Sequence, residues 1–167
     1  MHLTDTYCLI VLIHIAVSRT VGKSTLDYAD FLQKKGICLA KMKHYQQALD
    51  VHKQAMSIYT TINSASHMSV KTSLFNIALC LISLGESTRA RECLFDVYKI
   101  ISTELGDGSS EMIDIQFYIG ISFKQEGNFK SAKKYIDDAI QLRRLHSKYE
   151  CKEAAEALES VGDVVRL

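Results

Sequence analysis

Residues Val21–Thr25, with the sequence Val-Gly-Lys-Ser-Thr, come closest in this chain to a phosphate-binding motif. A P-loop places Gly-Lys-Ser/Thr after a buried strand, where backbone N–H groups and the lysine hold phosphates. The motif also needs Gly, or sometimes Ala, five residues before Gly22, and Val17 stands there. The sequence also shows no later strand with an aspartate for magnesium. We therefore interpret this segment as a link between helices and expect no nucleotide cofactor.

Cysteine and histidine side chains could support metal or thiol chemistry, but their spacing does not favour it. The six histidines show no His-x-x-x-His or Glu-x-x-His pairing, and the five cysteines include no Cys-x-x-Cys pair. Cys38 and Cys80 share a repeat position with Ser122, which a small buried core residue explains. No glycine-rich loop or nucleophile elbow positions a reactive group. The sequence therefore predicts no enzyme, no cofactor, no metal site and reduced thiols in the cytoplasm.

The composition restricts the class of protein. The 167 residues are 47% hydrophobic, enough to build the core of one domain. Lys and Arg number 20 against 19 Asp and Glu, so no net field would attract nucleic acid or an anionic membrane. Proline is absent and the 8 glycines are widely spaced. These features favour an all-α fold with short turns.

The apolar segment Tyr7–Val17 leaves two interpretations open. It is too short to span a bilayer, which needs about 20 apolar residues. It has the length of the apolar region of a signal peptide, but Asp5 stands where a basic residue is expected. The interpretation that the sequence favours is a buried helix at residues 2–18, the second helix of a preceding repeat.

Small residues return at a constant interval along the chain. One series is Gly36, Ala78, Gly120 and Gly162, and a second is Ala48, Ala90 and Ala132. Each step is about 42 residues, an interval typical of helical repeat proteins. Two helices approach closely where one side chain is reduced to Gly or Ala, so we expect contacts such as Gly36 with Ala48.

Apolar residues at three- and four-residue steps predict two antiparallel helices in each repeat. The predicted boundaries are 25–61 for repeat 1, 67–103 for repeat 2, 109–146 for repeat 3, and 151–167 for the first helix of a truncated repeat 4. Together with the helix at 2–18, this predicts about eight helices in a single repeat domain over 1–167. The bare ends suggest a fragment of a longer array or a piece that self-associates.

The pattern resembles the tetratricopeptide repeat. The matching residues are Gly36, Tyr45, Ala48 and Ala55 in repeat 1, and Gly120, Phe123, Gly127, Phe129, Ala132 and Ala139 in repeat 3. The length of the interval and Leu74-Phe-Asn-Ile-Ala78 resemble the kinesin-light-chain-like subtype. The family's His-Pro link is missing, Ser87 replaces an aromatic residue and Val97 replaces an alanine. Armadillo and HEAT repeats have similar lengths and are the alternative.

The resemblance implies a right-handed superhelical solenoid that binds protein or peptide partners in a concave groove, with no nucleic acid and no membrane. The groove residues it implies are Gln33, Ile37, Lys41, Thr72, Phe75, Asn76, Leu79, Asp114, Phe117, Ile121 and Lys124. Asn76 would bind the ligand backbone, and Phe75 and Phe117 are either anchors or core. Gln33 and Ile37 do not fit a clamp for chaperone tails. Self-association through the apolar ends is the alternative function.

Overall fold

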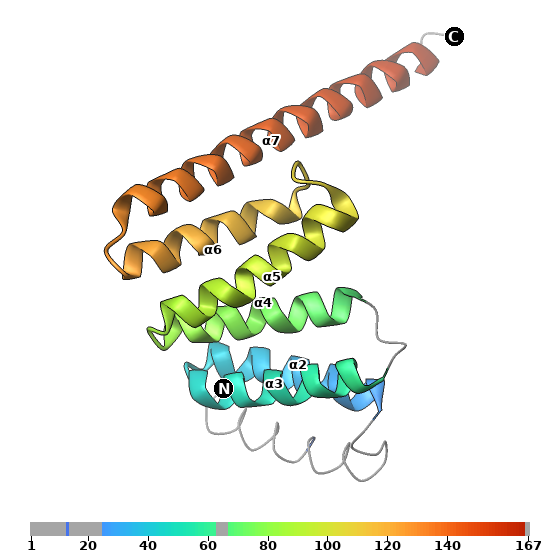
Figure 1. Ribbon diagram of the computed structural model, residues 1–167. Coiled ribbons are helices and arrows are strands. Elements are labelled where there is room, and N and C mark those ends of the chain that lie inside the picture. The colour runs from blue at the N-terminus through green and yellow to red at the C-terminus, as the bar shows by residue number, and fades with distance from the viewer. Residues whose placement is uncertain (1–12, 14–24, 63–66, 166–167) are drawn as a thin grey trace. The chain divides into compact units, whose positions relative to one another are not determined.

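The computed structural model describes Ile13 and residues 25–62 and 67–165, with side chains as far as 147. The regular structure of these residues is entirely α-helical (Figure 1). Its helices are α2 (Leu26–Lys41), α3 (Tyr45–Thr61), α4 (His67–Ser83), α5 (Ser87–Leu105), α6 (Glu111–Gln125) and α7 (Phe129–Val165). None of them is both long enough and apolar enough to cross a membrane. Apart from Ile13, the helix predicted at 2–18 lies outside the described residues.

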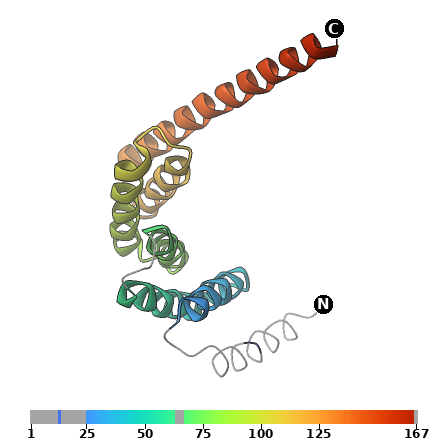
Figure 2. The same ribbon diagram turned by 90° about the vertical axis from the view of Figure 1, so that its right-hand side faces the viewer.

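The chain divides into two compact units, Met1–Ile100 and Ile101–Leu167, and the division falls within α5. In the first unit α2 and α3 form an antiparallel pair, and α4 packs against α3 and touches α2 (Figure 1). In the second unit α6 packs against α7, and both views show α7 as one helix that continues past α6 (Figures 1 and 2). The antiparallel pairing predicted within repeats 1 and 3 is therefore present.

The turns that join the two helices of each repeat have the same hydrogen bonds. The N–H groups of His44, Glu86 and Asn128 donate to the carbonyls of Leu39, Leu81 and Phe123, at 2.9, 2.9 and 3.0 Å. These bonds satisfy carbonyl groups that the end of the first helix leaves unpaired. One residue earlier the backbone has a positive φ each time, 64° at Lys43, 82° at Gly85 and 77° at Gly127. Lys43 therefore occupies a conformation that favours glycine.

We expect Lys43→Gly to stabilise the protein. Relief of the left-handed backbone at a non-glycine residue outweighs the greater entropy of glycine in the unfolded chain, for a net gain of about 0.5–1 kcal/mol. Urea denaturation measures this change in the free energy of unfolding. The matched control is Gly85→Lys, which should destabilise by about 1 kcal/mol, because a Cβ there meets nothing within 4 Å and only the backbone is strained. A loss of stability in Lys43→Gly would contradict this explanation.

The small residues of both series are buried where the structure describes their surroundings. Ala48, Ala78 and Ala90 have no exposed surface, and Ala132 is 4% exposed. The atoms nearest to a Cβ placed on Gly36 belong to the ring of His52. The equivalent space beside Gly120 holds Ile136, with the carbonyl oxygen of Ala132 nearby. The side chains that fill the space beside Gly36 and Gly120 therefore lie one helical turn after the alanine, and the expected contact of Gly36 with Ala48 stays a prediction.

The prediction of about eight helices is corrected by α7. Residues 129–165 form one continuous helix of 37 residues, where the sequence predicted an end near 146 and a new helix from 151. The repeat interval suggested a break there. Locally, however, no Gly, Pro or Asn occurs between Phe129 and Val161, so no residue favours a helix stop. Gly162 thus lies within α7.

Candidate binding surfaces

The residues predicted to line a groove lie on α2, α4 and α6 and differ in exposure. Ile37, Lys41, Thr72, Asp114, Phe117 and Lys124 are exposed, Phe75, Asn76, Leu79 and Ile121 are half-buried, and Gln33 is buried. The residues on α2 and α4 belong to one compact unit, and those on α6 belong to the other. The structure therefore presents two candidate surfaces.

The first surface contains a cavity of about 230 Å³ between α2, α3 and α4. Its lining residues are Asp30, Gln33, Lys34, Tyr59, Met68, Ser69 and Thr72. It brings together two predicted groove residues, Gln33 and Thr72. At its wall the hydroxyl of Tyr59 donates a hydrogen bond to the carboxylate of Asp30. Burial, and then this bond to Asp30, raise the pKa of Tyr59, so the phenol stays protonated as a donor.

Gln33 stands at the centre of a hydrogen-bond relay across three helices. Nδ1 of His52 on α3 lies 2.5 Å from Oε1 of Gln33 on α2, and Nε2 of Gln33 donates to Oγ of Ser73 on α4. The hydroxyl of Ser73 donates onward to the carbonyl of Ser69 at 2.9 Å. Because the amide oxygen can only accept, Nδ1 of His52 carries the proton in the neutral ring.

His52 is held neutral by its surroundings. Its side chain is 1% exposed, and burial lowers its pKa to about 4. Its other ring nitrogen, Nε2, faces Gly36, whose Cα offers no acceptor for a second proton. His52 therefore acts as a structural donor at neutral pH rather than as an acid or base.

Asn76 lies on α4, one turn after Thr72. Its Nδ2 atom is buried and has no hydrogen-bond partner. A buried amide donor without an acceptor costs about 1–3 kcal/mol. This side chain would therefore gain from a ligand that supplies an acceptor.

The second surface contains a cavity of about 250 Å³ between α6 and α7. Its lining residues are Ile113, Asp114, Phe117, Tyr118, Ala139, Ile140 and Arg143. It includes two more predicted groove residues, Asp114 and Phe117. The carboxylate of Asp114 lies 3.6 Å from the guanidinium of Arg143, an exposed pair of modest strength. Phe117 and Ile140 are 41% and 43% exposed, so the wall is apolar and accessible.

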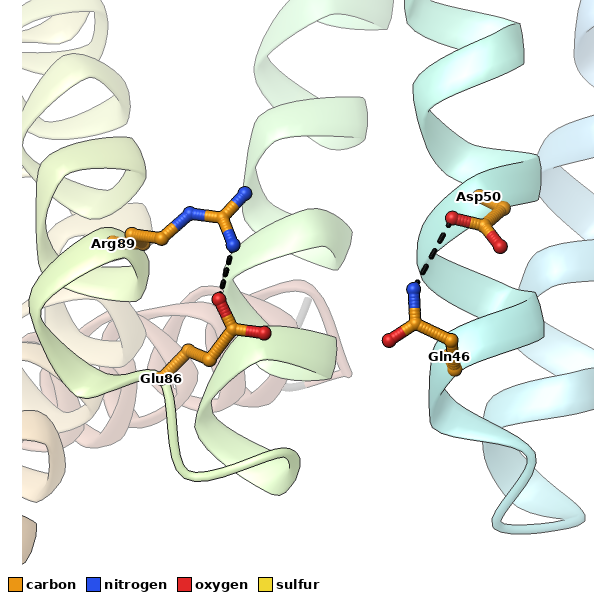
Figure 3. Close-up of polar contacts among 4 residues, drawn as sticks. All are labelled: Gln46, Asp50, Glu86 and Arg89. Carbon is orange, nitrogen blue, oxygen red and sulfur yellow. Dashed lines mark hydrogen bonds and ion pairs between the residues drawn. The ribbon is translucent and has the colours of Figure 1, made fainter.

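Two exposed polar contacts lie outside the linings of both cavities. On α3 the amide of Gln46 donates to Asp50 one turn later, at 3.3 Å, and at the start of α5 Glu86 pairs with Arg89 (Figure 3). Both interactions are local and exposed. Such contacts contribute little to stability. Substitutions at these positions, such as Gln46, therefore serve as controls for substitutions on the two candidate surfaces.

Little in the described residues offers catalytic chemistry. Burial raises the pKa of Cys80 and Cys93, which disfavours the reactive thiolate. No cluster of three potential metal-ligating side chains occurs in the part of the chain that the structure describes. Of the segment that resembles a P-loop, only Thr25 is described, and its hydroxyl caps α2 by accepting from the N–H of Tyr28 at 3.3 Å.

Sequence reasoning did not single out His52, Tyr59 or Arg143. The repeat interval offered one signal for His52, because the equivalent positions in the next two repeats hold the apolar residues Leu94 and Ile136. In the structure, His52 and Ile136 fill the space beside Gly36 and Gly120. A polar residue in an otherwise apolar repeat position indicates a buried hydrogen bond. The partners of that bond, on two other helices, carried no signal.

Helix pairs with the same turn and the same small residues at each repeat interval define a helical repeat protein of the solenoid class. Residues 27–102 match the tetratricopeptide repeat family. The fold of this chain is similar to that of kinesin-light-chain repeats in solved structures. Tetratricopeptide repeats are scaffolds for protein–protein interaction.

Two solved structures illustrate the similarity of fold. A kinesin light chain with nearly identical tetratricopeptide-like repeats from Podosopora anserina has a TM-score of 0.73 at 14% identity. The match covers 87% of this chain and 68% of that one. BtubC (BKLC) from P. vanneervenii has a TM-score of 0.68 at 15% identity, over 80% of this chain and 54% of that one.

Two curated relatives are similar in sequence. The tetratricopeptide repeat protein 19 homolog, mitochondrial, of Drosophila melanogaster is 29% identical over 129 residues, which cover 77% of this chain. The RxLR effector protein SFI4 of Phytophthora infestans is 24% identical over 123 residues, which cover 74%. This chain spans 32% and 36% of their lengths, about a third of each.

Proposed function

We propose that this chain is an adaptor that binds extended peptide segments of partner proteins along α2 and α4 and along α6. The observation that carries the proposal is the buried Nδ2 of Asn76, which lacks an acceptor in the middle of the predicted surface on α4. Rotation of this side chain towards a ligand would let it donate to a peptide carbonyl, the most abundant acceptor that a protein partner offers.

Exposed residues on both surfaces support the same type of ligand. On the first surface Ile37 of α2 is 40% exposed, and on the second Phe117 of α6 is 41% exposed. Lys41 of α2 and Thr72 of α4 add exposed polar groups to the first surface. One or two apolar anchors among hydrogen-bonding side chains suit a short linear peptide better than a large flat interface.

A displayed library of random peptides tests the proposal. Peptides enriched on the immobilised chain would be labelled, and their dissociation constants measured by fluorescence anisotropy. We expect Asn76→Ala to weaken binding about three- to tenfold, the loss of one hydrogen bond to a neutral acceptor. Gln46→Ala, on the outer face of α3, should bind as the wild type does. Failure to enrich any peptide, or equal affinities for wild type and Asn76→Ala, would count against this site.

The alternative of self-association through the N-terminal apolar segment rests on residues 8–17. Apart from Ile13 these lie outside the described residues. At the C-terminal end, in contrast, the residues up to Val165 are described as part of α7.

A further inference from the structure

The cavity between α6 and α7 occupies the same place in its repeat as the cavity beside α2 and α3. Two repeat intervals separate the equivalent positions. Asp114 and Arg143 correspond to Asp30 and Tyr59, which form a hydrogen bond at the same point. Phe117 corresponds to Gln33. The two cavities therefore differ mainly in what lies over them.

In the first unit, α4 lies over this position. Met68, Ser69 and Thr72 of α4 form part of the cavity wall, and Ser73 accepts from Gln33. As a result Gln33 is only 8% exposed, whereas Phe117 at the equivalent position is 41% exposed. No helix among the described residues lines the cavity between α6 and α7 besides these two. This apolar face thus lacks the helix that covers its counterpart.

The C-terminal part of α7 has the sequence pattern of the missing helix. Six buried positions of α4 are Lys71, Ser73, Ile77, Ala78, Cys80 and Leu81. Their equivalents two repeat intervals later are Ala155, Ala157, Val161, Gly162, Val164 and Val165, all small or apolar. A seventh, Ile82, corresponds to the charged Arg166. The exposed Met68 and Thr72 correspond to Lys152 and Glu156. Residues 151–165 therefore match α4 in the alternation of apolar and polar positions.

The continuity of α7 directs these residues away from their own α6. Nε2 of His146 lies 2.8 Å from the carbonyl oxygen of Gly108, so this point of α7 is level with the link that precedes α6. Residues 147–165 continue beyond it as helix (Figures 1 and 2), and a rise of about 1.5 Å per residue makes this extension about 28 Å long. Folding back over the same α6 and α7 would require a break in a stretch of helix that has no Gly or Pro to favour one.

We propose that two copies of this chain exchange these segments, so that residues 151–165 of each cover the face between α6 and α7 of the other. In the first unit α3 and α4 run in opposite directions. In the dimer the first part of α7 in one copy takes the place of α3, and residues 151–165 of the other copy take the place of α4, so the two α7 helices are antiparallel. An antiparallel pair of identical helices is related by a two-fold axis, so both contacts form at once and the dimer is closed. The exchange would cover Phe117 and so compete with peptide binding along α6. It leaves the peptide binding proposed for Asn76 untouched, since it involves no residue of α2 or α4.

Sedimentation equilibrium of the full chain tests the exchange. We expect the wild type to have twice the monomer mass of 18.8 kDa. Ile140→Glu on the face and Val161→Glu on the exchanged helix should each weaken the dimer at least tenfold, because each places a charge in an apolar contact. Lys152→Glu, at a position equivalent to the exposed Met68, should remain dimeric. Neither Ile140 nor Val161 lies on α2 or α4, so a failure here leaves the peptide-binding test at Asn76 unaffected.

Mixing the two disrupted variants distinguishes exchange from other arrangements. The Ile140→Glu variant keeps residues 151–165 unchanged, and the Val161→Glu variant keeps the face between α6 and α7 unchanged. The mixture should therefore form a heterodimer through the one contact in which neither side carries a substitution. A mixture that stays monomeric would overturn the exchange. A wild type that stays monomeric at high concentration would also overturn the exchange. If Val161→Glu then has a lower free energy of unfolding than the wild type, residues 151–165 cover the α6 and α7 of their own chain.

Discussion

Gly36→Ala is expected to destabilise the first unit by about 2 kcal/mol, the net cost of overpacking a buried helix contact. A Cβ at Gly36 would lie 2.5–2.8 Å from three ring atoms of His52, well inside van der Waals contact. The ring cannot retreat easily, because it is 1% exposed and bonded to Gln33. Overpacking of this kind costs about 3 kcal/mol, and the better helix propensity of alanine returns about 1 kcal/mol. Guanidinium denaturation measures the net loss.

The same substitution in a His52→Ala background provides the control. With the ring removed, the Cβ meets no obstacle from His52, and Gly36→Ala should then stabilise by about 1 kcal/mol through helix propensity alone. The effect of Gly36→Ala on the free energy of unfolding thus changes sign when His52→Ala is also present, and a double-mutant cycle measures this directly. An equal loss in both backgrounds would show that the ring is not the cause.

The second large effect is a loss of stability at acid pH that depends on His52. Its pKa is lowered from 6.5 to about 4 in the folded chain by burial. Between these values the unfolded chain binds a proton that the folded chain does not, so the free energy of unfolding falls as the pH falls. From pH 7 to pH 5 the loss from this group is about 2 kcal/mol.

Urea denaturation at pH 7 and pH 5, for wild type and His52→Gln, isolates this contribution. Glutamine can still donate to Gln33 but does not titrate, so the variant should lose about 2 kcal/mol less than the wild type over this interval. Other titrating groups affect both proteins alike and cancel in the comparison. If the two proteins lose the same stability, His52 is protonated in the fold at pH 5 and the proposed neutral relay is wrong.

The repeat interval and the turns between helices could be predicted because their signals are local. Small residues such as Ala48 and Ala90 mark each close approach, and the turn at Gly85 carries its own conformational requirement. The course of α7 could not be predicted in the same way. The repeat interval favoured a break near residue 147, but the local sequence contains only residues that continue a helix, and these prevail.

The candidate surfaces were predicted less completely than the fold. The groove positions implied by the resemblance include Thr72, which is exposed, but the sequence left Phe117 as either anchor or core, and its side chain is 41% exposed. The burial of Gln33 does not, because it depends on partners on two other helices, His52 and Ser73. Such a contact is non-local, and a polar residue within an amphipathic pattern does not reveal whether it faces water or a buried donor.

The two repeats use different chemistry at one shared position, and this makes them respond differently to ionic strength. In the first, the phenol of Tyr59 donates to Asp30, and because the phenol is neutral, screening by dissolved ions has little effect on the contact. In the third, Asp114 faces Arg143 across exposed surface, where added salt screens the attraction. Added salt should therefore weaken the contact across α6 and α7 slightly while leaving the contact of Tyr59 with Asp30 unchanged.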